Sequence, residues 1–173
     1  MKPIFFLFVM VVAFGVNAQQ EKLRAIIQSD AQWYLRDKVL DPSGEYFPDE
    51  RLLGQGFALF TYTDGDFQAG IRYENYQNVM LGFPTGYQGE GITYRYARIR
   101  RDNWDITVGN FYEQFGSGLI FRSYEERGLG LDNAMDGVRI ITKLGQGLKL
   151  KGVIGRQRKY FSKINHHTEH FQP

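Results

Sequence analysis

The amino-acid sequence predicts an all-β protein, an antiparallel meander of about seven to eight strands. Three observations lead to this prediction. Apolar and polar residues alternate with a period of two through most of the chain after residue 18, the pattern of strands with one apolar and one polar face. Residues that favour turns separate the alternating runs at hairpin spacing. The 173 residues include 20 glycines and 16% aromatic residues but only 5 prolines, as expected for many strands joined by tight turns.

Residues 1–18 are predicted to be a secretory signal peptide. Lys2 gives this segment a positive start, an apolar run extends from Ile4 to Phe14, and Val16 to Ala18 has the small residues of a cleavage site. The apolar run is well short of the ~20 residues that a membrane-spanning helix needs. We therefore expect an exported protein whose β region covers residues 19–155.

The first part of the β region is predicted to contain one strand and one hairpin. Gln20 to Ile27 has a brief helical pattern, and Ala31 to Arg36 then alternates as a strand does. The hairpin joins Phe57 to Thr63 with Asp66 to Tyr76. Its turn is Asp64-Gly65, because Asp-Gly supplies the positive φ angles of a two-residue type I′ turn.

Two further hairpins follow in the same way. Gly91 to Arg100 is separated from Trp104 to Tyr112 by three polar residues, and Val138 to Lys143 from Leu148 to Gly155 by a glycine-rich turn. Leu119 to Tyr124 supplies a candidate eighth strand. All these strands can be connected without a crossover helix, so the predicted sheet is antiparallel.

Alternation alone does not say whether the apolar face is buried in a sandwich or turned to lipid. Three features favour an outer-membrane β-barrel, or an incomplete part of one. The predicted strands have about 9 to 11 residues, as a tilted membrane strand requires. Gly70, Gly109 and Gly152 fall inside strands, where a small residue allows a sheet to curve. Aromatic residues lie near strand ends or on apolar faces, as in an aromatic girdle; they are Tyr62, Tyr73, Tyr76, Tyr94, Tyr96, Trp104 and Tyr112. The alternative is a secreted soluble β-sandwich that binds glycan through its Tyr and Trp residues.

The composition excludes several functional classes. The chain has 21 Lys and Arg against 19 Asp and Glu, whereas a protein that binds nucleic acid usually has a clustered basic excess. The absence of cysteine excludes disulfides, thiolate zinc sites and cysteine nucleophiles. We expect no nucleic-acid partner and no cofactor.

Charged residues are concentrated in the connection between the second and third hairpins. They are Glu113, Arg122, Glu125, Glu126, Arg127, Asp132 and Asp136. Because glycines lie among them, opposite charges at this density predict an ion-pair network that pins the connection in the lumen or over one mouth. The alternative is that the same charges line a solute path or bind a partner. Glu125 and Glu126 do not predict glycoside hydrolysis, since adjacent strand residues point to opposite faces. We expect no catalytic residues here.

This connection also carries a family resemblance. The segment from Gly109 to Arg139 contains a Gly-Asn-Phe-Tyr-Glu run, then Phe-Gly-Ser-Gly-Leu, then Arg-Ser-Tyr-Glu-Glu-Arg and Asp-Asn. It resembles a segment of an uncharacterised family of large outer-membrane β-barrel proteins of Bacteroidota type, catalogued as a domain of unknown function. The resemblance implies an outer-membrane location, with membrane lipid and an envelope protein as candidate partners. Members of that family are much longer, so this chain resembles an N-terminal fragment.

Residues 156–173 are predicted to form an irregular tail, as in a truncated or frameshifted gene product. The tail has no alternation and no glycine, and it contains all three histidines, His166, His167 and His170. Without a scaffold to fix ligand geometry, these histidines do not predict a metal site. The resulting hypothesis is a non-catalytic outer-membrane β-barrel protein that acts in solute passage, as a scaffold or in envelope assembly. The alternative location is secreted or periplasmic.

Overall fold

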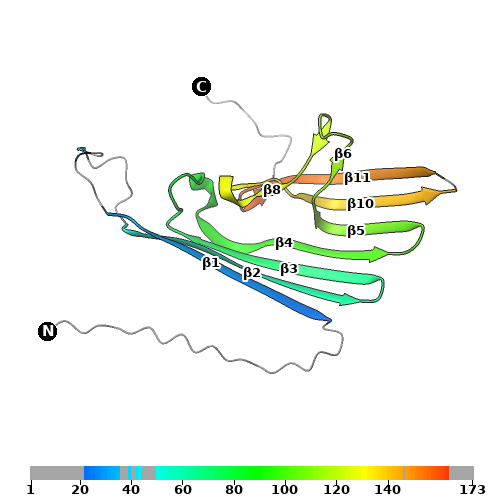
Figure 1. Cartoon of the computed structure of the whole chain (residues 1–173), viewed down its shortest axis with the longest axis horizontal. Helices are drawn as coiled ribbons and strands as arrows, with labels where there is room; N and C mark the ends of the chain where they lie inside the picture. The colour runs from blue at the N-terminus through cyan, green and yellow to red at the C-terminus, as the bar shows by residue number, and fades with distance from the viewer. Residues whose placement is uncertain (1–21, 36–38, 40–41, 44–49, 146, 164–173) are drawn as a thin grey trace.

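The computed structural model describes residues 22–35, 39, 42–43, 50–145 and 147–163. These residues form an all-β structure dominated by one curved antiparallel sheet with the strand order β1-β2-β3-β4-β5-β10-β11-β12 (Figure 1). The sheet is not closed, since β1 and β12 lie at its two ends. The predicted antiparallel meander is therefore confirmed. The predicted signal peptide and the three histidines lie outside the described residues.

The main sheet consists of long strands, and shorter elements lie between and after them. The long strands are β1 (Leu23–Trp33), β2 (Leu52–Asp64), β3 (Phe67–Gln77), β4 (Gly89–Arg100), β5 (Trp104–Phe111), β10 (Met135–Leu144) and β11 (Leu148–Lys159). The short strands are β6 (Gln114–Phe115), β7 (Phe121–Arg122), β8 (Glu125–Glu126), β9 (Leu131–Asp132) and β12 (Ser162–Lys163). Two 3-10 turns, η1 (Thr85–Tyr87) and η2 (Arg127–Leu129), complete the described elements.

Three expectations about strand boundaries are wrong. The helical pattern at Gln20 to Ile27 gives way to β1 from Leu23 onward, because ladder bonds to β2 outweigh a weak local preference for helix. The sheet does not stop at Gly155, since β11 continues to Lys159 and β12 follows. Leu119 to Tyr124 does not enter the main sheet. Only Phe121–Arg122 is extended, and it pairs with β6.

The two ends of the sheet differ in the length of their connections. Tight turns join β2 to β3, β4 to β5 and β10 to β11, and they lie together at the right of Figure 1. The first is Gly65-Asp66, one residue later than predicted, with Asp64 paired to Phe67 and Gly65 at φ 55°. The links from β3 to β4 and from β5 to β10 are long and leave the sheet at the strand ends away from these turns, where β1 also ends and β2 begins. We call these the turn end and the loop end.

The register gives the sheet two chemically different faces. In adjacent strands Phe60 pairs with Ile71, and Ile140 pairs with both Ile106 and Gly152. The apolar face defined by this register carries the exposed side chains Leu23, Ile27, Trp33, Leu52, Phe60, Tyr62, Phe67, Ile71, Tyr73, Ile99, Val108, Ile140, Leu144, Leu148, Leu150 and Ile154. The polar face carries Arg72, Glu74, Tyr94, Arg98, Asp105, Thr107, Arg139 and Lys151.

Buried apolar side chains in the described part of the chain gather near the loop end, where the connections approach the sheet. They are Leu53, Met80, Tyr87, Phe111, Ala134 and Met135. Tyr87 contacts Tyr76 and Tyr160, with ring centroids 5.2 and 4.9 Å away. This small core lies under the connections and leaves the apolar face uncovered.

Among the residues described, no helix has the length and apolar character needed to cross a lipid bilayer.

Candidate functional site

The connection between β5 and β10 is folded into two small hairpins, β6-β7 and β8-β9. In the first, the Glu113 backbone N–H donates to Ser123 Oγ at 2.9 Å, and the Ser123 N–H donates to the Glu113 carbonyl at 2.8 Å. In the second, the Tyr124 N–H donates to Asn133 Oδ1 at 2.6 Å. These local hydrogen bonds place Glu125 opposite Asp132 in the β8-β9 pair.

A buried charge cluster joins this connection to the sheet. It consists of Arg72 and Glu74 of β3, Glu125 of β8, Asp132 of β9 and Arg158 of β11. Arg72 donates from Nη1 to both Glu125 oxygens at 3.0 and 3.1 Å and from Nη2 to Asp132 Oδ2 at 2.5 Å. Its Nε lies 2.7 Å from Glu74 Oε1, an ion-pair contact that lacks hydrogen-bond geometry.

Arg158 holds the other side of the cluster. Its Nη2 donates to Glu74 Oε2 at 2.7 Å, its Nη1 donates to Asp132, and its Nε donates to the Tyr160 carbonyl. Asp132 also accepts from the Tyr112 hydroxyl at 2.9 Å. Arg72 is 4% exposed and Glu74 2%. Charges buried this deeply require paired partners, and here each guanidinium bridges carboxylates from different elements.

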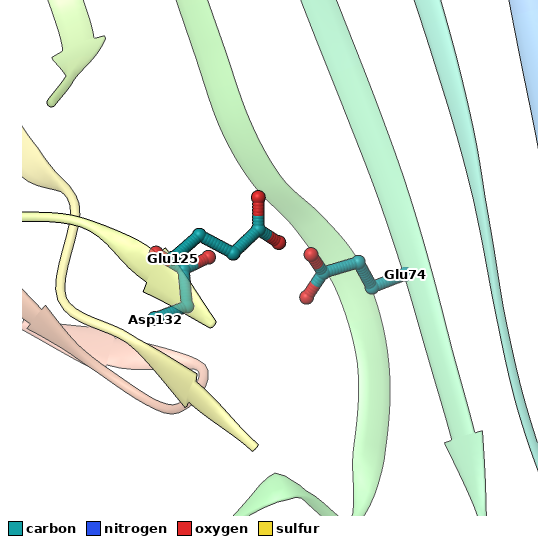
Figure 2. A group of neighbouring side chains, drawn as sticks. All are labelled: Glu74, Glu125 and Asp132. Atoms are coloured by element: carbon teal, nitrogen blue, oxygen red, sulfur yellow. The ribbon is translucent and has the colours of Figure 1, made fainter. Parts of the chain in front are cut away.

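The carboxylates of the cluster have the spacing of a metal site, but their partners do not fit one. One oxygen each from Glu74, Glu125 and Asp132 lies within 4.8 Å of the other two, and the side chains converge as Figure 2 shows. Carboxylate oxygens are suitable ligands for a hard cation. A cation at this point would have to displace Arg72 and Arg158, leaving two buried guanidinium groups without counter-charges. The arrangement therefore fits an ion-pair lock that pins the connection to the polar face.

A second charge group lies nearer the turn end. Glu113 accepts from Arg139 Nε and from Lys151 Nζ, each at 2.6 Å. Arg139 also donates to Thr107 Oγ1 at 3.1 Å, and Arg98 Nε donates to Asp105 Oδ1 at 2.8 Å. Burial raises the pKa of the Glu113 carboxyl, but hydrogen bonds from Lys151, the Gln114 N–H and Arg139 lower the pKa further, so it lies below its ordinary value. Glu113 is thus a second anchor for the connection.

Between the connection and the polar face lies a cavity of about 400 Å³. Tyr94, Tyr96, Tyr112, Arg98 and Arg139 contribute to its lining. Tyr94 stacks on Tyr112 with a centroid distance of 5.4 Å, and the Arg72 guanidinium lies 5.1 Å from the Tyr94 ring. The lining is aromatic and cationic, with its charges largely engaged in the two groups described above.

The structure distributes the predicted site residues unevenly. Glu113, Glu125 and Asp132 act as anchors, as a pinning network requires. Arg127 pairs with Glu125 at 2.8 Å and covers the Phe57 ring. The remaining three are not part of the network. Arg122 lies over the Tyr124 ring, Glu126 is exposed, and Asp136 belongs to β10 on the apolar face.

Three members of the cluster were not predicted from the sequence. Arg72 and Glu74 occupy ordinary polar positions of an alternating strand, where nothing distinguishes them from solvated side chains. Arg158 falls in the segment expected to be an irregular tail. Extending the strand pattern beyond Gly155 would have placed Arg158 at the sheet.

A family model described as a family of unknown function, DUF6029, matches residues 1–170. No curated protein matches the chain significantly.

Proposed function

The chain belongs to the family DUF6029, and we propose that it forms one wall of a β-barrel in a bacterial outer membrane. Its proposed role is non-catalytic, in solute passage, as a scaffold or in envelope assembly. Export through the N-terminal signal peptide is part of the proposal.

The observation that carries this proposal is the exposed apolar face. Ile27 on the edge strand β1 and Ile154 on β11, near the other end of the sheet, are each 75% exposed, and Val108 on the central strand β5 is 53% exposed. Contiguous apolar surface on this scale is unfavourable in water, at roughly 25 cal/mol per Å². A soluble sandwich would cover it with a second sheet, but in the described part of the chain the connections pack on the polar face instead. Lipid is the environment that suits such a face.

Strand length and aromatic placement support the same environment. The long strands have 8 to 13 residues, which brackets the ~9 to 11 residues of a tilted membrane strand. On the apolar face Trp104, Tyr62 and Phe67 lie near the turn end, and Trp33 lies at the loop end. Aromatic residues at both margins of an apolar band are typical of a membrane barrel.

The polar face supports a non-catalytic role. The carboxylates of the two charge groups that anchor the connection, Glu74, Glu113, Glu125 and Asp132, are paired with guanidinium or ammonium groups. Their contacts hold a connection in place beside a polar cavity. A pinned connection suits a lumen that is lined or narrowed by the protein.

Adjacent isoleucines of β10 provide the test. Ile140 lies at mid-strand on the apolar face, and Ile141 lies on the polar face opposite Lys151 and Asp105. We expect Ile140→Lys to lose stability in lipid vesicles by about 2–4 kcal/mol, the cost of a lysine near the bilayer midplane. Ile141→Lys, the matched control, should insert as the wild type does. The measurement is vesicle flotation followed by urea unfolding.

Two results would contradict the proposal. One is recovery of the wild-type chain in the soluble fraction without detergent, with a cooperative melt. The other is an equal effect of both lysine substitutions, which would mean that the two faces meet the same environment.

A further inference from the structure

A small cavity lies where the loop-end part of β4 separates from β5. The β4-β5 ladder ends at Tyr96 and Gly109, and beyond it the Arg95 backbone N–H donates to the Asn110 side chain at 2.9 Å. The cavity has a volume of about 120 Å³, and its lining includes Thr93, Arg95, Asn110 and Asp136. This is about four times the volume of a liquid water molecule.

Arg95 is the unusual member of this lining. It is exposed and in register with Ile71, so it belongs to the apolar face. Its guanidinium makes no ion pair or hydrogen bond with any residue that the structure describes. A lone arginine facing lipid costs about 2–4 kcal/mol near the midplane and much less at the interface. Such a group is stabilised when it reaches an anion, and guanidinium matches phosphate oxygens in a bidentate way.

Thr93 supplies a second polar group. It sits at a β-bulge, since Arg72 pairs with Tyr94 whereas Tyr73 pairs with Ile92. Its hydroxyl has no hydrogen-bond partner and is buried. Bulges re-aim side chains, and a buried hydroxyl without a partner is costly. Thr93 and Arg95 line the same cavity, so an oxygen bound there by Arg95 could also accept a hydrogen bond from the Thr93 hydroxyl.

On the side of β5, β10 and β11, the cavity lies where the apolar face becomes polar. In register across β5, β10 and β11, Asn110, Asp136 and Arg156 form a polar row. Val108, Val138 and Ile154 form the next row on the same face toward the turn end. A change from apolar to polar residues along one face marks the depth at which acyl chains give way to headgroups.

We propose that this cavity binds the phosphodiester of a membrane phospholipid, an inference that rests on the proposed membrane location. Arg95 binds the phosphate oxygens, Thr93 donates a hydrogen bond, and the acyl chains extend along the apolar rows toward the turn end. Asp136 lines the same cavity, so a singly charged phosphodiester suits it better than a dianionic phosphate. Only the phosphate group of the lipid enters the cavity, and the rest of the lipid lies outside it.

The test measures retained lipid and membrane insertion separately. The wild type, Arg95→Gln and the control Arg24→Gln are inserted into vesicles of phosphatidylglycerol and phosphatidylcholine, and in parallel into phosphate-free galactolipid vesicles. Arg24 is an exposed arginine on the polar side of β1. After exchange into detergent, native mass spectrometry quantifies bound phospholipid. We expect Arg95→Gln to retain about tenfold less than the wild type, the effect of one lost charge-assisted hydrogen bond. Arg24→Gln should match the wild type, and all three should float.

The outcomes separate the two proposals. If Arg95→Gln floats and retains phospholipid like the wild type, the lipid site is wrong while the membrane location stands. If the wild type floats neither with the phospholipid vesicles nor with the galactolipid vesicles, both proposals are wrong. If Arg95→Gln alone fails to insert, Thr93→Val decides, since unchanged retention would overturn the site. Displacement of the phospholipid by inorganic phosphate would also overturn it, because the ligand would then be a free anion.

Discussion

At the scale of single residues, the most constrained groups are the buried charges of the polar face. Asp132 accepts from Arg72, Arg158 and Tyr112 and also from the Ala134 backbone N–H at 3.1 Å. Each acceptor position is used, and each partner comes from a different part of the chain. Removing this carboxylate leaves buried positive charge without compensation.

We therefore expect Asp132→Ala to lower the free energy of unfolding by about 3–5 kcal/mol, the usual cost of breaking a buried pair. Urea unfolding in vesicles or detergent measures it. Asp64→Ala is the matched control, because Asp64 pairs with Lys22 at 3.0 Å and both side chains are about half exposed. It should change the unfolding free energy by less than about 0.5 kcal/mol. Equal effects of the two substitutions would contradict the ion-pair lock.

Glu113 makes the stability of the folded β5-β10 connection depend on pH. A carboxyl whose pKa is lower in the folded state than in the unfolded chain adds stability above its unfolded pKa, and this stability is lost as the pH falls through the folded pKa. The pKa of Glu113 is lowered in the folded state, where burial is outweighed by hydrogen bonds from Lys151, Gln114 and Arg139. We expect the hydrogen-exchange protection of residues 112–134, measured against the intrinsic exchange rate at each pH, to fall below about pH 4, the unfolded range of glutamate.

Glu113→Gln is the control for this effect. The variant removes the titrating group and keeps the shape of the side chain, so exchange in residues 112–134 should be faster at neutral pH and less sensitive to acid. If the variant and the wild type respond to acid in the same way, another group controls the connection.

At the scale of elements, a row of glycines allows three strands to approach closely. Gly109, Gly137 and Gly155 are in register across β5, β10 and β11. A Cβ atom at Gly137 would lie 2.0 Å from the Ile154 carbonyl oxygen, and one at Gly155 would lie 2.6 Å from the Asp136 carbonyl oxygen. Because the obstructing atoms belong to the backbone, the sheet would have to open to admit a side chain.

Gly137→Ala should therefore destabilise the sheet by about 1–3 kcal/mol, the usual range for overpacking. Gly152→Ala is the control on the neighbouring strand, since a Cβ there meets nothing within 4 Å. The midpoints of urea unfolding compare the two. A smaller effect at Gly137 than at Gly152 would show that the row is not needed for close approach.

At the scale of the whole molecule, the connections indicate an orientation. Membrane barrels have short turns on the periplasmic side and longer loops outside. The tight turns of this sheet share one end and the long connections share the other (Figure 1). If the sheet belongs to the proposed outer-membrane barrel, the turn end is expected in the periplasm and the loop end outside the cell.

Because the chain has no cysteine, single cysteines can report this orientation without background. We expect Leu119→Cys, in the β5-β10 connection and exposed, to react with a membrane-impermeant maleimide on intact cells. Asp102→Cys, in the β4-β5 turn, should react only after the outer membrane is opened. Labelling of both positions on intact cells would contradict the orientation.

The directions of the strands set a condition for closing the sheet into a barrel. β1 and β11 both start at the turn end, so they run in the same direction and cannot pair antiparallel with each other. Closure into an antiparallel barrel requires an odd number of intervening strands. The short β12 pairs antiparallel with β11, so it has the direction required of the first intervening strand.

Much of the sheet could be predicted from the sequence. Side-chain alternation and turn residues act over neighbouring positions, so the hairpins at 57–76, 91–112 and 138–155 were predicted with small errors at their ends. The helical pattern near Ile27 and the boundary at Gly155 were wrong for a common reason. Both stretches are strands because a neighbouring strand pairs with them, and short-range patterns do not contain that information.

The charge site could be predicted only in part. Density of charge indicated Glu113, Glu125 and Asp132, because they lie close together along the chain. Their partners Arg72, Glu74 and Arg158 are distant in sequence, and only the folded connection brings them together.

By itself, the sequence determined an antiparallel meander with one apolar and one polar face, since strand periodicity is a local property of the chain. The tertiary structure decided which charges neutralise one another, because pairing buried charges depends on contacts between distant elements. It also decided that the apolar face is left uncovered and that Arg95 lies on this face beside Asn110 of the polar row. Those facts follow from how the connections fold over one face of the sheet.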